Sequence, residues 1–337
     1  MKKITAKYPS NIALIKYWGK YGIQLPMNPS ISLTLSEAYT ETSIELFEKK
    51  SKEIEFNYFF EGKSNSKFSD RVINYIKNQE EFRPLLDNYS LKIESKNSFP
   101  HSAGIASSAS AFATIAALLL KVSSTNDQSL DFKKKASHFA RLGSGSACRS
   151  FQGPYMLWGK LDDVSESSNE YAIQVNEVHP NFQKMQDAIL IVEDEPKKVS
   201  SSVGHSLMNN HPYASARFKD ANKHCIEMLS TLKSGDFDSF ISITEREALS
   251  LHSMMMTSED YYMLMKPGTV SIIEKIFAFR NDTKLPICFT LDAGPNVHLL
   301  YPEIIKDKVE KFINEIKDQY KFVIFDKAGK GGEVFEK

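Results

Sequence analysis

Apolar and polar residues follow two different spacings along the chain, and together these spacings predict a mixture of strands and helices. Alternation with a period of two predicts strands at residues 31–35 and 41–47. An apolar segment at residues 110–120 can only be a buried helix, and the stripe of Phe132, Ala136 and Phe139 predicts another helix at residues 130–142. Further strands are expected at residues 4–16 (broken by Pro9), 53–60, 89–94, 155–158, 188–193, 287–291, 297–301 and 322–325, and further helices at 68–76, 214–232, 237–255, 270–280 and 303–316.

The order of these elements indicates an α+β fold, because strands and helices mix without regular βαβ repetition. The pattern changes near residue 180, after a hydrophilic loop at residues 162–170. A chain of 337 residues is long enough for two ordinary domains. The sequence therefore predicts one domain at residues 1–180 and a second at residues 181–337.

The composition excludes several classes of partner. Acidic and basic residues balance at 42 each without a long basic run, which argues against nucleic acid or an anionic membrane as the main partner. The N-terminus lacks the apolar region of a signal peptide, and the apolar run ending at Leu120 is too short to span a bilayer. Three scattered cysteines without C-x-x-C pairing favour a reduced cytoplasm, and the spacing of the eight histidines predicts no zinc site.

A run of small residues at positions 95–109, Ser-Lys-Asn-Ser-Phe-Pro-His-Ser-Ala-Gly-Ile-Ala-Ser-Ser-Ala, leads directly into the apolar helix. Small residues let backbone N–H groups approach a ligand, and the first turn of a helix leaves its N–H groups unpaired. These features predict an anion site, to which the hydroxyls of Ser107 and Ser108 could add bonds to phosphate or Mg²⁺. A core helix capped by a Ser-rich loop is the other interpretation. Neither a Walker A motif nor a G-x-G-x-x-G fingerprint is present.

A few charged residues could carry chemistry. Asp292 follows an apolar strand and precedes Ala-Gly-Pro, a position typical both of a catalytic carboxylate and of an ordinary Asp-initiated turn. Arg149 closes a Gly/Ser-rich turn and could bind a carboxylate or phosphate, or lie on the surface. Lys16 and Lys20 are one helical turn apart and could clamp a polyanion, unless they are solvated. The combination is typical of phosphoryl transfer without a covalent nucleophile.

Four segments of the sequence are distinctive. They are Ser-Asn-Ile-Ala-Leu-Ile-Lys-Tyr-Trp-Gly-Lys at 10–20, Phe-Pro-His-Ser-Ala-Gly-Ile-Ala-Ser-Ser-Ala at 99–109, Gly-Ser-Gly-Ser-Ala-Cys-Arg at 143–149 and Asp-Ala-Gly-Pro-Asn at 292–296. These segments closely resemble motifs of the diphosphomevalonate decarboxylases, a family of the GHMP kinase superfamily. The resemblance covers nearly the whole chain in the family's order, and it implies a two-domain α+β GHMP kinase fold with the active site in the inter-domain cleft, commonly as a homodimer.

The resemblance also implies a reaction. ATP would phosphorylate the tertiary hydroxyl of mevalonate 5-diphosphate, after which phosphate and CO₂ would leave to give isopentenyl diphosphate, a step of the mevalonate pathway of isoprenoid biosynthesis. Phosphorylation turns a poor leaving group into a good one, and its loss builds positive charge that the neighbouring carboxylate relieves by expelling CO₂. Two related activities stay open: decarboxylation of the monophosphate, and a kinase reaction that stops at phosphorylation. A fold kept as an inactive binding protein is a third possibility.

Residue roles follow from the same resemblance. Asp292 matches the catalytic carboxylate that accepts or orients the hydroxyl proton, Lys16 a lysine beside the transferring phosphoryl group, and Arg149 the ligand of the substrate carboxylate. The implied substrate-binding residues are Tyr17, Lys20, Ser144, Gly145, Ser146, Arg149 and Ser201. The implied ATP-binding residues are Ser95, Asn97, Pro100, Ser102, Ala103, Gly104, Ala106, Ser107 and Ser108, with Ser108 also a catalytic candidate and a possible ligand of a Mg²⁺ ion held mostly by ATP phosphates.

The sequence departs from the family pattern at three places. Gln24 stands where the family often has Asn, in a turn that is also shorter here. His205 follows Gly204 where the family often has Met, and an Asn-Ser-Ser pattern reads Asn-Pro-Ser at residues 28–30. Because two of these changes lie near the lysines expected to bind substrate phosphates, they leave room for a changed phosphate count. The number of available donors favours the diphosphate.

Overall fold

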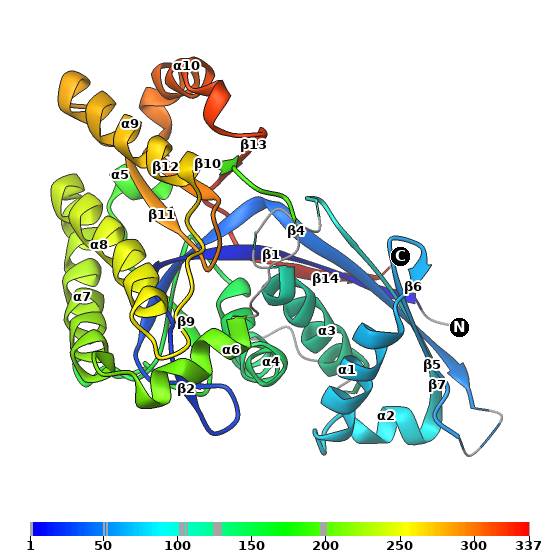
Figure 1. Cartoon of the computed structure of the whole chain (residues 1–337). Coiled ribbons are helices and arrows are strands. Elements are labelled where there is room, and N and C mark those ends of the chain that lie inside the picture. Colours follow the sequence, from blue (N-terminus) through cyan, green and yellow to red (C-terminus); the bar gives the residue numbers. More distant parts are fainter. Residues whose placement is uncertain are drawn as a thin grey trace.

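The computed structural model describes residues 3–49, 51, 53–100, 105, 107–123, 130–195 and 201–336, without the side chains of residues 130, 131, 201 and 202. Strands and helices alternate irregularly along it, which confirms the predicted α+β class (Figure 1). None of the helices in these ranges combines the length and apolar character that a bilayer span requires.

The first sheet is built mainly from the first half of the chain. Its order is β14-β1-β4-β7-β5-β6, with β8 beside β4 and β9 beside β8. The predicted strand at residues 155–158 is confirmed as β8. The strands are β1 (Lys3–Ile15), β4 (Ser30–Glu48), β5 (Phe56–Phe60), β6 (Lys63–Ser64), β7 (Tyr89–Asn97), β8 (Tyr155–Trp158), β9 (Ala172–Gln174) and β14 (Glu333–Glu336), and a hairpin of β2 (Lys20–Tyr21) and β3 (Leu25–Pro26) stands apart.

The long strands β1 and β4 differ from their predicted forms. Pro9 does not break β1; instead the register with β4 shifts between Pro9 and Asn11. A proline has no N–H to donate, so it is tolerated where a bulge interrupts the ladder. The strands predicted at residues 31–35 and 41–47 are one strand, β4, because the segment between them keeps an extended backbone.

Helices of the first half cover one face of this sheet. In Figure 1, α3, α4 and α1 lie against the blue strands. Every residue of α3 from Ala109 to Leu120 is buried, so this helix has no solvent face over that stretch. Its Phe112 packs with Ile4 and Tyr8 of β1 in one core cluster. The helices are α1 (Ser66–Lys77), α2 (Arg83–Asn88), α3 (Ser107–Ser123), α4 (Leu130–Gly143) and the short 3₁₀ helix η1 (Gly145–Ser150).

The second sheet, with the order β11-β12-β10-β13, is antiparallel. Its strands are β10 (Met185–Ile191), β11 (Cys288–Leu291), β12 (Val297–Pro302) and β13 (Phe322–Lys327). Its helices are α5 (Pro180–Gln183), α6 (Ser201–Ser206), η2 (Leu207–Asn210), α7 (Ala214–Ser234), α8 (Phe237–Met256), α9 (Pro267–Thr283), η3 (Glu303–Ile305), α10 (Lys306–Glu315) and η4 (Lys317–Gln319). The helix predicted at residues 303–316 therefore begins as a 3₁₀ turn.

A shared core joins the two sheets. Leu14 of β1 and Leu33 of β4 belong to the same buried cluster as Ile189 of β10 and Met228 of α7. The chain also returns to the first sheet at its end, where β14 pairs with β1 (Figure 1). The polar sequence Glu-Val-Phe-Glu of β14 gave no strand signal, because its pairing depends on a partner more than 300 residues away along the chain.

Candidate active site

Lys16 begins the candidate site, directly after the end of β1. Its side chain is almost fully buried, with 1% of its surface exposed, and Nζ donates a hydrogen bond of 2.5 Å to the carbonyl oxygen of Ala13. Burial lowers the pKa of Lys16 to about 8, and this effect is opposed by the negative charges of Asp292 and Glu247. A solvated surface lysine, the ordinary interpretation of this residue, is therefore excluded.

Arg149 lies in η1 and is also buried, so the surface interpretation is wrong for it as well. Its Nη1 donates to the hydroxyl of Ser30 at 2.7 Å and its Nε to Oδ1 of Asn11 at 3.3 Å. The guanidinium carbon lies 5.6 Å from the centre of the Trp158 ring, within cation–π range. These contacts fix one side of the guanidinium group, while Nη2 donates to no described residue.

Asp292 comes from the other half of the chain, in the turn between β11 and β12. The ring nitrogen Nε2 of His252 lies 3.1 Å from the main-chain oxygen of Asp292, and the N–H of Gly294 donates to the same oxygen at 2.7 Å. The carboxylate interacts electrostatically with Lys16 and Arg149. Asp292 thus forms the predicted turn and, half-buried, also interacts with the two buried cations.

Tyr17 is packed between Trp158 and His205, with ring centroids 4.6 Å and 4.3 Å away. Its hydroxyl is buried and has no hydrogen-bond partner among the described residues. It faces Gly145, where an added Cβ would lie 2.9 Å from the Tyr17 oxygen. An unpaired buried hydroxyl is costly, so this oxygen is available to a ligand.

His205 and Gln24, two of the departures from the family pattern, contact the candidate site directly. Nδ1 of His205 accepts the N–H of Gly19 at 3.0 Å, and burial, followed by the charge of Lys20, lowers the pKa of His205 to about 3. The imidazole is therefore neutral near pH 7. Nζ of Lys20 donates to Oε1 of Gln24 at 3.2 Å, and Gln24 has a left-handed backbone (φ 56°) that Asn adopts more readily than Gln.

Two of the serines predicted for the candidate site contact each other. The hydroxyl oxygens of Ser108, at the start of α3, and Ser144, before η1, lie 3.3 Å apart, which brings the two small-residue segments together. Ser146 is half-buried, and its carbonyl accepts from Asn11. Ser201 begins α6, but its side chain lies outside the described residues.

The predicted ATP loop is described only in part. Ser102, Ala103, Gly104 and Ala106 lie outside the described residues. Pro100 is exposed, and the N–H of Ser107 donates to the carbonyl of Ile105 at 2.6 Å.

Two members of the predicted ATP set are already bonded to β4. The hydroxyl oxygens of Ser95 and Thr42 lie 2.9 Å apart, and Asn97 Oδ1 accepts from Thr40 at 2.8 Å. These side chains therefore help to hold β7 against β4. Their contact with ATP stays a prediction.

Several buried polar residues around Lys16 were not predicted from the sequence. The carboxylate of Glu247 accepts the main-chain N–H of Lys16 at 2.8 Å, and Arg217 and His224 bind the same carboxylate. Glu247 lies four residues after Ile243 and four before Leu251, both buried. A charged residue within an apolar helical stripe was the available signal, because such residues are rarely buried without a partner.

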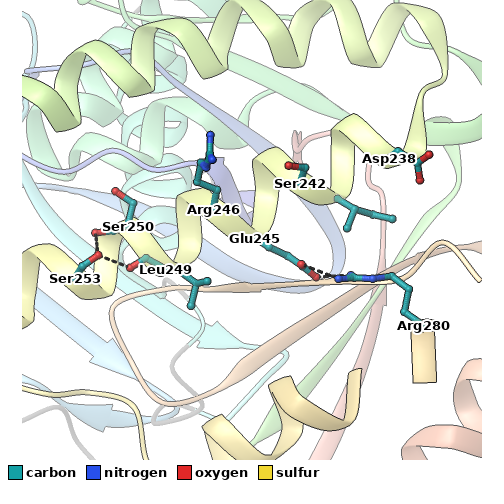
Figure 2. A pocket seen from close by; sticks show the side chains of 9 residues that line it. Asp238, Ser242, Glu245, Arg246, Leu249, Ser250, Ser253 and Arg280 are labelled. Atoms are coloured by element: carbon teal, nitrogen blue, oxygen red, sulfur yellow. Dashed lines mark hydrogen bonds and ion pairs between the residues drawn. The ribbon is translucent and has the colours of Figure 1, made fainter. Parts of the chain in front are cut away.

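Two surface cavities lined wholly by described residues contain none of the predicted site residues. One, of about 610 Å³, lies along α8 and is lined by residues such as Asp238, Arg246 and Arg280 (Figure 2). The other, of about 480 Å³, lies where β1 and β4 meet residues 327–333. No group of three or more His, Cys, Asp or Glu side chains suited to a metal ion occurs in the described part of the chain.

Comparison with known proteins gives matches over both halves of the chain. Residues 8–170 match the family model of the diphosphomevalonate decarboxylase-like N-terminal domain, and residues 188–331 match that of the mevalonate 5-diphosphate decarboxylase C-terminal domain. The diphosphomevalonate decarboxylase of Ganoderma lucidum is 30% identical, over 98% of this chain and 88% of its own length.

Solved structures agree with these matches. The mevalonate diphosphate decarboxylase of Staphylococcus aureus superposes with a TM-score of 0.84 at 29% identity, covering 99% of this chain and 98% of the other. A structure described as MDDEF in complex with MVAPP, AMPPCP and magnesium gives a TM-score of 0.83 at 28% identity, covering 100% and 99%. The resemblance and the fold inferred from the sequence motifs are both confirmed.

Proposed function

Since the chain belongs to the diphosphomevalonate decarboxylase family, we propose that it catalyses the ATP-dependent decarboxylation of mevalonate 5-diphosphate to isopentenyl diphosphate, with release of ADP, phosphate and CO₂. One observation of this structure supports the proposal above others. The buried Lys16 and Arg149 and the half-buried Asp292, from three distant parts of the sequence, interact electrostatically as one charge cluster. Two cations facing one carboxylate suit a reaction in which phosphoryl and carboxylate charges must be held together.

We give each of these residues the role that the resemblance to the family implies. Asp292 accepts or orients the proton of the tertiary hydroxyl, and Lys16 stabilises the transferring phosphoryl group. Arg149 binds the substrate carboxylate through Nη2 and the remaining Nη1 hydrogen, because Nε and the other Nη1 hydrogen are donated to Asn11 and Ser30. Loss of phosphate then leaves positive charge on the tertiary carbon, and expulsion of CO₂ from the held carboxylate completes the alkene.

The substrate diphosphate is assigned to the donors around Tyr17. These are the unpaired Tyr17 hydroxyl, the Lys20 ammonium group and, from the Gly/Ser segments, Ser144, Gly145, Ser146 and Ser201. The number of donors favours a diphosphate, since unpaired donors in a dry site each cost about 1–3 kcal/mol. The monophosphate is the second candidate, because Gln24 bonds Lys20 and His205 packs on Tyr17, which narrows this end of the site.

ATP is assigned to the other side of the cluster, at the start of α3. The described residues fit a Mg²⁺ ion held mainly by nucleotide phosphates, because Ser108 offers a hydroxyl but no carboxylate cluster surrounds it. Bound there, the ion neutralises phosphate charge. Ser108 is the residue that orients the nucleotide toward Ser144.

The remaining parts of the proposal are the compartment and the assembly. We place the enzyme in the cytoplasm, supported by the buried free thiols of Cys148, Cys225 and Cys288, which a reducing compartment keeps unpaired. We also propose a homodimer, by analogy with the family; a molar mass measured by light scattering tests it.

A coupled assay for ADP, run with mevalonate, its monophosphate and its diphosphate and combined with CO₂ detection, tests the proposed reaction. The diphosphate should give the highest kcat/KM and one CO₂ per ADP. ADP without CO₂ would indicate a kinase, and a preference for the monophosphate would indicate the second candidate and make His205 and Gln24 the first residues to replace.

A further inference from the structure

The main chain of Lys16 is held by buried side chains on both of its polar atoms. Glu247 accepts the N–H at 2.8 Å, whereas Nη2 of Arg217 and Nδ2 of Asn28 donate to the carbonyl oxygen at 3.2 Å and 2.9 Å. β1 ends at Ile15, so these side chains replace the lost ladder partners. The position of Lys16 thus depends on α7 and α8 of the other half of the chain.

Glu247 is itself fixed as a carboxylate. Its Oε1 is 3.1 Å from Nη1 of Arg217 and 2.6 Å from Nδ1 of His224, and its Oε2 is 2.6 Å from Nη2 of Arg217. Burial opposes the charged form, but His224, Arg217 and the Lys16 N–H outweigh it, so the pKa of Glu247 lies below its ordinary value. A fully buried negative charge therefore stands behind Lys16.

Charged groups from four elements face Lys16. Asp292, after β11, and Glu247, on α8, favour its ammonium form, while Arg149 in η1 and Arg217 on α7 oppose it. On α7, Cys225 also faces Glu247, but burial raises the pKa of its thiol well above the ordinary value, so it stays neutral. Glu247 is thus one of two negative charges that offset burial at Lys16.

We propose that Glu247, oriented by Arg217 and His224, is a positioning residue that fixes the main chain of Lys16 and supplies the buried negative charge facing its ammonium group. The role of Glu247 in catalysis rests on the proposed function. Its effect on the protonation of Lys16 does not, because that protonation can be measured without any reaction.

The test is an NMR titration of protein labelled with ¹³C at the lysine Cε, with the Lys16 signal identified by its absence in Lys16→Met. In Glu247→Gln the pKa of Lys16 should fall by on the order of one unit, because the amide keeps the shape but not the charge. The alkaline limb of kcat/KM should move to lower pH by the same amount. A change of packing alone would lower activity without moving this limb.

Glu245→Gln is the matched control. Glu245 lies on the same helix and is also buried, and it receives hydrogen bonds from Nη1 and Nη2 of Arg280 at 2.6 Å and 3.0 Å. Figure 2 shows this pair at the cavity along α8. This substitution should destabilise the fold to a similar degree, while the Lys16 titration and the alkaline limb stay unchanged.

Arg217→Gln should shift the pKa of Lys16 in the opposite direction, and it is the replacement test if Glu247→Gln does not fold. It removes a positive charge that opposes the Lys16 ammonium group, so the pKa of Lys16 should rise. An unchanged Lys16 titration in Glu247→Gln, equal shifts in both glutamate variants, or a fall in Arg217→Gln would overturn the inference. Failure of the wild type to turn over mevalonate diphosphate would contradict the proposed function instead. The titration would still test whether Glu247 sets the pKa of Lys16.

Discussion

Tyr17 and Arg149 share one property at the scale of single residues, which is hydrogen-bonding capacity that no described residue uses. The Tyr17 hydroxyl has no partner among the described residues, and Arg149 directs its Nε and one Nη1 hydrogen to Asn11 and Ser30. Buried polar groups of folded proteins are nearly always paired. We therefore propose that substrate binds at this unpaired capacity, and each residue around it can be tested singly.

Replacement of Asp292 by Asn should remove most turnover. The amide keeps the size of the side chain but cannot accept the hydroxyl proton, and the loss of one positioned acid–base group costs on the order of 10² to 10⁴ in rate. kcat for mevalonate diphosphate measures the effect, with the melting temperature and the affinity for an ATP analogue as controls. Near-normal kcat with an intact fold would remove Asp292 from the mechanism.

Arg149→Lys should be damaging although it keeps the charge. A lysine cannot bond Asn11, Ser30 and a carboxylate at once in the planar geometry of Arg149. We expect kcat/KM to fall by about 10².

Lys20→Met should instead act mainly on affinity for phosphorylated ligands, measured by titration calorimetry, and should weaken it more than Arg149→Lys does. Mild and equal effects of both variants would indicate that neither side chain binds substrate.

His205 should make the fold sensitive to mild acid. Its pKa is about 3 in the folded protein, against about 6.5 in an unfolded chain, so the unfolded state takes up a proton that the folded state refuses. Stability is therefore lost as pH falls below 6.5, by about 2 kcal/mol at pH 5. Urea unfolding of wild type and His205→Gln at pH 7.5 and pH 5 measures this. Parallel losses in the two proteins would show that another group titrates.

At the scale of elements, the sequence predicted best those segments whose pattern is local. The all-apolar run made α3 evident, and alternation with a period of two made both ends of β4 evident. The predicted break at Pro9 was wrong, and β14 was missed. Both errors arise because the structure of these segments depends on a distant partner strand. The same holds for the site: Lys16, Arg149 and Asp292 stand in motifs, whereas the bond between Glu247 and the main chain of Lys16 depends on the packing of α8 behind β1.

The 3₁₀ helix η1 shows how an element shapes the site, and Gly145→Ala tests it. A Cβ there would lie 2.9 Å from the Tyr17 hydroxyl and 3.0 Å from Trp158, so Tyr17 must move. Misplacement of a binding group by about 1 Å costs up to about 10² in rate, and we expect KM for the diphosphate to rise at least tenfold. In Gly62→Ala an added Cβ meets no atom within 4 Å, so the left-handed backbone (φ 77°) should lower stability while KM stays unchanged. Equal KM values for the two variants would contradict this role of η1.

At the scale of the whole molecule, the site depends on how the two sheets are joined. We propose the domain boundary near residue 180, with residues 1–180 and 181–337 as the two units, although β14 pairs back into the first sheet. Asp326 of β13 reaches across this junction to β4. Its oxygens accept the N–H groups of Ser36, Glu37 and Ala38 at 2.8, 2.9 and 2.7 Å. No local pattern in the sequence could have indicated such a contact, because the two strands are about 290 residues apart.

Replacement of Asp326 by Ala should therefore destabilise the whole fold. Asp326 is 4% exposed, and its loss leaves three main-chain N–H groups of β4 without their acceptor. Since an unpaired buried donor costs about 1–3 kcal/mol and water will reach some of them, we expect a loss on the order of 3 kcal/mol. Lys327→Ala is the control, because its partner Glu37 is as exposed as Lys327, and such pairs contribute about 0–1 kcal/mol. Urea unfolding measures both variants. If Asp326→Ala were as stable as Lys327→Ala, the hydrogen bonds of Asp326 would not hold the junction, and the shared apolar core would hold it alone.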